Sequence, residues 1–120
     1  MKIQIKPLIW IGSSKKKLMS LPQKIQVNFG YALFLAQGGG QDPQAKPLKG
    51  FNGNGVLEVV SSLLRSTYRI VYTTDFKDGI YVLHCFQKKS TQGISTNQSD
   101  MNLIFSNYKS AKLNSQEIFK

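Results

Sequence analysis

The chain has 120 residues, the usual size of one domain, and it is long enough to bury a hydrophobic core without disulfides or metal ions. A hydrophobic share of 41% excludes a disordered chain, and 16 lysines and arginines against 6 acidic residues give a net charge of +10. This charge favours a polyanionic partner, which leaves nucleic acid, an anionic membrane or an acidic protein as alternatives. We expect one domain over residues 1–120, with a core at about 6–112 and a polar tail at 113–120.

Cysteine content and hydropathy indicate the compartment. Cys85 is the single cysteine of the sequence, which excludes a disulfide framework and a cysteine-based zinc site and predicts a reducing cytoplasm. The apolar stretch at residues 7–11 is too short for the core of a secretory signal. No run approaches the roughly 18 apolar residues of a membrane span, so we expect no membrane partner.

The first third of the chain predicts a strand followed by two helices. Residues 8–11 are bulky and apolar between a proline and a glycine, which is typical of a short buried strand. A short basic helix is expected at residues 14–20, and a second one from Pro22 to about Gln37. One core-facing stripe of the second helix recurs at helical spacing: Leu21, Ile25, Phe29, Ala32, Leu33 and Ala36.

The rest of the chain predicts a small sheet and a last helix. Residues 41–55 contain prolines and glycines typical of an irregular connection. Three β-rich runs follow, at residues 56–60, 68–74 and 80–86. Their short links predict an antiparallel meander, and the third run is apolar on both faces, as in a strand covered on both sides. A final helix is expected at residues 100–113 after a polar segment.

These elements predict an α+β fold. The N-terminal strand and the three-stranded meander would form a small antiparallel sheet, packed against two N-terminal helices and a C-terminal helix. Because such a fold serves several functions, the function must be inferred from the site residues.

Few residues are available for acid–base chemistry. A single histidine and 6 acidic residues give little material for a Ser-His-Asp triad or a two-carboxylate hydrolase, and we expect no metal site. Strand alternation places His84 on the same face as Val82 and Phe86. Two interpretations follow: a neutral, hydrogen-bonded core histidine, or an acid or base that faces RNA.

Basic residues provide more candidates for binding and cleaving RNA. If the strands pair as a meander, Arg69 and Lys88 lie near each other on one sheet face. RNA cleavage by its own 2′-hydroxyl requires a deprotonated nucleophile, a stabilised phosphate charge and a protonated leaving oxygen, and arginine and lysine can supply the second requirement. The remaining candidates for RNA-backbone contact are Lys46, Lys49, Arg65 and Lys89. Four aromatic side chains either stack on bases or belong to the core: Tyr68, Tyr72, Tyr81 and Phe86.

Several sequence blocks resemble one known family when they are taken in order. They read KPLKGF at residues 46–51, GVLEVV at 55–60, TYRIVYT at 67–73 and YVLHCFQKKS at 81–90. This order is similar to the phage-derived, HigB-like branch of the RelE/ParE toxin superfamily of type II toxin–antitoxin systems, over roughly residues 6–108.

The resemblance implies a ribosome-associated mRNA endoribonuclease that needs no metal or cofactor and is neutralised by a helix-turn-helix antitoxin from an adjacent gene. It implies that Arg69 binds phosphate and that Lys88 lies near the basic residue that follows the last strand, so both are catalytic candidates. His84 is a further catalytic candidate from its own chemistry, as the acid or base that would face RNA. Where relatives often carry more basic residues on the first meander strand, this chain has Glu58 and Val60. Where the branch has Thr-Pro-Lys, it has the sequence TNQ at residues 96–98.

Two other functions fit the same residues. A ParE-type toxin directed at gyrase would share the fold and the basic surface. A non-catalytic, decayed toxin would only bind its antitoxin or nucleic acid, and the few acid–base residues support that alternative.

Overall fold

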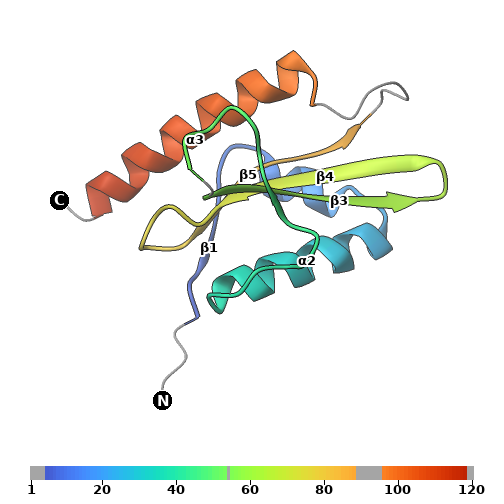
Figure 1. Cartoon of the computed structure of the whole chain (residues 1–120), viewed down its shortest axis with the longest axis horizontal. Coiled ribbons are helices and arrows are strands. Elements are labelled where there is room, and N and C mark those ends of the chain that lie inside the picture. The colour runs from blue at the N-terminus through green and yellow to red at the C-terminus, as the bar shows by residue number, and fades with distance from the viewer. Residues whose placement is uncertain (1–4, 54, 89–95, 119–120) are drawn as a thin grey trace.

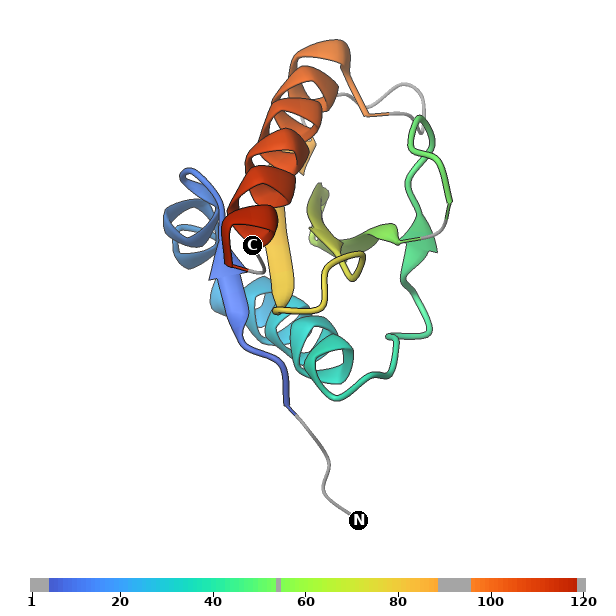
Figure 2. The same ribbon diagram turned by 90° about the vertical axis from the view of Figure 1, so that its left-hand side faces the viewer.

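A computed structural model describes residues 5–53, 55–88 and 96–118. The sheet has five strands in the order β1-β5-β4-β3-β2, with α2 against one face, α3 across the other and α1 beside the edge at β1 and β5 (Figures 1 and 2). The elements are β1 (Leu8–Trp10), α1 (Ser14–Met19), α2 (Gln23–Gln37), β2 (Lys46–Pro47), β3 (Val56–Leu63), β4 (Ser66–Thr73), β5 (Ile80–Lys88) and α3 (Gln98–Ile118). The predicted α+β class is confirmed.

Each face of the sheet carries its own hydrophobic cluster. Phe29 and Leu33 of α2 pack on Tyr72 and Val82 on one side, while Ile104 of α3 packs on the other. The predicted stripe of α2 is confirmed, since Ile25, Phe29, Ala32, Leu33 and Ala36 are all buried and Leu21 packs against the same cluster. β5 is buried along most of its length, as its apolar sequence predicted.

The sheet differs from the prediction in the direction of its first strand. β3, β4 and β5 form the expected antiparallel meander, but β1 pairs with β5 in parallel, with Leu8 opposite Ile80. Parallel neighbours need a long crossover, and here the whole chain between β1 and β5 supplies it. β2 adds a short fifth strand, because Lys46 and Pro47 pair with β3 inside the segment predicted to be irregular.

The first hairpin is tighter than the seven-residue link predicted at 61–67. β3 runs on to Leu63 and β4 begins at Ser66, so that only Leu64 and Arg65 form the turn. Leu64 has φ +56°, which is the left-handed region that a two-residue hairpin requires at its first position. Small polar residues extend the strands beyond the core here, and Ser61 accepts a hydrogen bond from Asn28 of α2.

The last helix is longer than expected. It starts at Gln98, where the Asn97 side chain accepts the backbone N–H of Asp100 as a helix cap. It continues beyond residue 113 because Asn114 donates to the Tyr81 hydroxyl and Ser115 donates to Asp78 on the turn before β5. The segment predicted as a polar tail is thus helical as far as Ile118. Among the described residues no helix is long and apolar enough to cross a membrane.

Candidate active site

A buried ion pair lies on the face of the sheet that carries α3. Arg69 is in the middle of β4, and its Nη1 donates to Oε2 of Glu58 on β3 at 2.8 Å. The same nitrogen donates at 3.3 Å to the hydroxyl of Thr96, just before α3. Only 7% of the Arg69 side chain and 18% of the Glu58 side chain are exposed. The predicted phosphate ligand is therefore held by a carboxylate inside the protein.

The strand register explains why these two side chains meet. Arg69 is directly opposite Val60, and Glu58 is directly opposite Val71, so that the two charges are diagonal neighbours on one face. Diagonal pairs in antiparallel strands are within reach of long side chains. The pairing also satisfies both charges, since an isolated buried charge would cost several kcal/mol.

Two lysines share this face with the ion pair. Lys46 of β2 is the direct partner of Glu58, and Lys88 of β5 is the partner of Thr67, two residues before Arg69 on the same strand. Directly opposed residues of antiparallel strands point to the same side. Partial burial and the charge of Arg69 lower the pKa of the Lys88 ammonium, while Glu58 opposes this effect. Three basic residues from three strands therefore lie on the same face as Glu58, and Arg69 is the one in contact with it.

His84 lies on the same side of the sheet but is turned toward α3. Its Nε2 is 2.8 Å from Oδ1 of Asp100, and its ring stacks on Phe86 at a centroid distance of 4.5 Å. Burial lowers the pKa of His84, although the hydrogen bond to Asp100 opposes that shift. A side chain only 3% exposed and with a lowered pKa fits the neutral core histidine, one of the two interpretations of the sequence.

The prediction that His84 shares a face with Val82 and Phe86 is confirmed for Phe86 and wrong for Val82. His84 shares its face with Phe86, as expected, but Val82 points to the α2 side. The register between β4 and β5 shifts between Val71 and Tyr72, so that His84 pairs with Val71 while Val82 pairs with Tyr72. Such a β-bulge adds one residue and reverses the alternation on one side of it.

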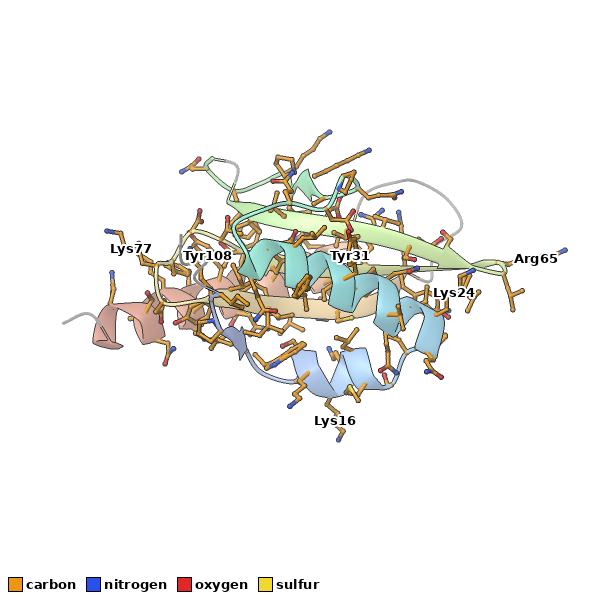
Figure 3. The ribbon with its side chains drawn as sticks, turned by 90° about the horizontal axis from the view of Figure 1, so that it is seen from below. Lys16, Lys24, Tyr31, Arg65, Lys77 and Tyr108 are labelled. Atoms are coloured by element: carbon orange, nitrogen blue, oxygen red, sulfur yellow. The ribbon has the colours of Figure 1, made fainter. Side chains whose placement is uncertain are left out.

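The remaining predicted RNA contacts are more widely spread. Arg65 is exposed at the hairpin turn, four residues before Arg69 and so roughly 13 Å along the strand (Figure 3). Lys49 is exposed in the loop that follows β2. Lys89 lies outside the described residues. The structure thus places Arg69, Lys88 and Lys46 on one face of the sheet, whereas Arg65 lies in the hairpin turn and Lys49 in the loop after β2.

The four aromatic side chains proposed for base stacking are core residues. Their exposed fractions are 8% for Tyr68, 0% for Tyr72, 0% for Tyr81 and 9% for Phe86. The core alternative is therefore confirmed for all of them.

Three polar residues of this site were not predicted as functional. Glu58 was noted only as a departure from the family pattern, although a lone charge inside an apolar strand beside another strand with a lone arginine indicates a cross-strand pair. Thr96 and Asp100 carried no such signal, because they reach the site only when α3 packs on the sheet. Within the described ranges, no group of three or more His, Cys, Asp or Glu could hold a metal ion.

The toxin–antitoxin complex RelBE2 of Mycobacterium tuberculosis contains a chain that is 20% identical, with a TM-score of 0.46, over 74% of this chain and 98% of that chain. Comparison with curated proteins finds no match. The model of the family described as phage derived protein Gp49-like (DUF891) matches residues 16–109, which is most of the chain. The sequence blocks predicted a phage-derived family, and the chain belongs to the Gp49-like family of phage-derived proteins.

Proposed function

We propose that this chain is the toxin of a type II toxin–antitoxin system and cleaves mRNA on the ribosome. The observation that carries the proposal is the pair of Arg69 and Glu58, which places a permanent cation and a carboxylate in contact on one sheet face with Lys46 and Lys88 beside them. The net charge of +10 and the ordered sequence blocks of the HigB-like branch support it.

Arg69 would stabilise the charge of the reacting phosphate. A guanidinium carries five N–H donors in one plane, so it can hold a carboxylate and a phosphate oxygen at the same time. Its place on a central strand, fixed by Glu58 and Thr96, keeps it rigid. Preorganised charges contribute most where charge develops in the transition state, and here that charge is on the pentavalent phosphorus.

Glu58 and Lys88 would move the protons. Glu58 takes the proton of the RNA 2′-hydroxyl while the 2′-oxygen attacks phosphorus, and the bond from phosphorus to the 5′-oxygen breaks. Lys88 donates a proton to that leaving oxygen, a role that its lowered pKa favours. The products are a 2′,3′-cyclic phosphate and a 5′-hydroxyl. Glu58 is the one carboxylate that the described structure places in contact with Arg69, which is why we assign the base to it.

Expression of the chain in a bacterium, with and without the helix-turn-helix protein of the adjacent reading frame, tests the proposal. Growth arrest with cleaved mRNA, relieved by the neighbouring protein, is the expected result. Arrest with intact mRNA and a DNA-damage response would instead support a gyrase-directed toxin. Undisturbed growth at verified expression of folded protein would support the non-catalytic alternative.

A further inference from the structure

The outer side of α2 carries an apolar surface away from both cores. Val27, Tyr31 and Phe34 are exposed by 62%, 57% and 58%, and they recur at helical spacing on one side of the helix. Figure 3 shows Tyr31 and Lys24 on this helix. Single exposed apolar residues are ordinary, but three adjacent ones on one helix form a contiguous patch of the kind that marks an interaction site.

Gly30 lies inside this patch, and because it has no side chain it leaves a hole between its neighbours. Residues 27, 30, 31 and 34 have the i, i+3, i+4, i+7 spacing of the hole that receives one side chain of a facing helix. A Cβ on Gly30 would meet open space, so no described neighbour requires a glycine there. A glycine in a helix interior costs about 1 kcal/mol relative to alanine, so its presence favours a surface built for the close approach of another helix.

The charge around the patch identifies the kind of partner. Between residues 14 and 37 the chain has four lysines and no acidic residue. Lys24 lies one turn before Val27, and Lys15, Lys16 and Lys17 occupy α1. A second copy of this chain would bring the same lysines and another net charge of +10, which opposes self-association. An acidic amphipathic helix has the matching charge and the matching shape.

We propose that the outer face of α2, formed by Val27, Gly30, Tyr31 and Phe34, is the docking surface for an acidic amphipathic helix of the antitoxin. The inference rests on the proposed function and names a surface for its partner. One apolar side chain of that helix enters the hole above Gly30, and its acidic residues lie beside Lys24. The surface is on the side of the sheet opposite to Arg69 and Glu58, and the two sites are therefore separate.

Binding of the purified protein of the adjacent reading frame to variants of the whole chain tests the docking surface. Tyr31→Asp places a negative charge in the centre of the patch and should weaken binding roughly 30-fold or more, as loss of a central contact does. Leu113→Asp is the matched control, because Leu113 is 62% exposed on α3 and should leave binding unchanged. Lys24→Glu should weaken binding more at low salt than at high salt.

A second variant separates docking from folding. Gly30→Gln fills the hole with a residue that favours helix, so it should raise the melting temperature and still weaken binding. Tyr31→Asp binding as tightly as the parent would overturn the docking surface and leave the proposed function intact. A dimer of the chain alone that Tyr31→Asp dissociates would also overturn it, with a second copy as the occupant. Failure of the parent chain itself to bind would overturn both the docking surface and the antitoxin partner, whereas the proposed cleavage of mRNA is decided by the expression experiment.

Discussion

The guanidinium of Arg69 and the carboxylate of Glu58 meet at 2.8 Å across the β3–β4 pair, and both side chains are largely buried. The contact joins a cation proposed to bind phosphate to the carboxylate proposed to accept a proton. It also means that Arg69 cannot be removed as if it were a surface charge. Its loss leaves Glu58 partly buried without this partner, which lowers stability as well as activity.

The pair is best tested by replacing both charges at once. Arg69→Ala alone should destabilise the fold by about 2–4 kcal/mol, since it leaves the partly buried carboxylate of Glu58 without this cation. Glu58→Leu combined with Arg69→Met keeps the volume without the charges, and its free energy of unfolding should be within about 1 kcal/mol of the parent. Cleavage by this double variant should fall by at least about 10²-fold, measured beside urea unfolding. A stable double variant with parental cleavage would remove the pair from the mechanism.

Lys88 should contribute a backbone contact to bound RNA. Lys88→Ala should reduce the slope of log affinity against log salt by about 0.7, the value for one phosphate contact on a single strand. A 2′-O-methyl oligonucleotide, which has no free nucleophile, allows binding to be measured by titration without cleavage. Lys112→Ala on the exposed side of α3 is the control and should leave the slope unchanged. Equal slopes for both variants and the parent would exclude the contact.

His84 should make folding stability depend on pH. Its pKa in the folded protein is lowered by burial, so the unfolded chain, with a histidine pKa near 6.5, binds the proton more readily. The contribution of His84 to stability is therefore complete above about pH 6.5. It falls as the pH drops from that value toward the pKa of the folded protein, and below that pKa it changes no further. His84→Gln should lose this part of the slope between pH 7 and pH 5.5 in chemical unfolding. If His84→Gln kept the pH dependence of stability that the parent shows, that dependence would come from other groups.

The hairpin turn should gain stability from a glycine. Leu64 is 95% exposed and has φ +56°, a conformation that costs a side chain of this kind about 1 kcal/mol and that glycine adopts freely. Leu64→Gly should raise the free energy of unfolding by about 0.5 kcal/mol, after the greater flexibility of glycine in the unfolded chain is subtracted. Arg65→Gly at the next position is the control and should not stabilise the protein. A destabilised Leu64→Gly would show that Leu64 contributes a contact.

The sequence predicted the elements well where periodicity was strong. The stripe of α2 recurs at helical spacing, and the three meander runs are short, rich in β-branched and aromatic residues and bounded by turns, so the α+β class followed from them. The parallel direction of β1 could not be predicted, because a short apolar run is the same whichever way its partner runs. The helical end of α3 depends on hydrogen bonds from Asn114 and Ser115 to residues more than 30 positions away.

The sequence predicted the basic residues of the site but not the residues that contact them. Arg69 and Lys88 were expected on one face and are found there. The contact with Glu58 depends on a register that the two-residue turn at Leu64 sets, and the predicted longer link left this register open. The orientation of His84 depends on the bulge in the β4–β5 pair, which alternation alone cannot reveal.

The most direct test of the central claim is the chemistry of the RNA ends in a reconstituted translation reaction. The parent chain should cleave the translated mRNA to leave a 2′,3′-cyclic phosphate and a 5′-hydroxyl. One 2′-deoxy substitution at the cleavage position should block it, and the double variant of Glu58 and Arg69 should be inactive. Cleavage that persists past the 2′-deoxy substitution, or that the double variant performs at the parental rate, would contradict the account.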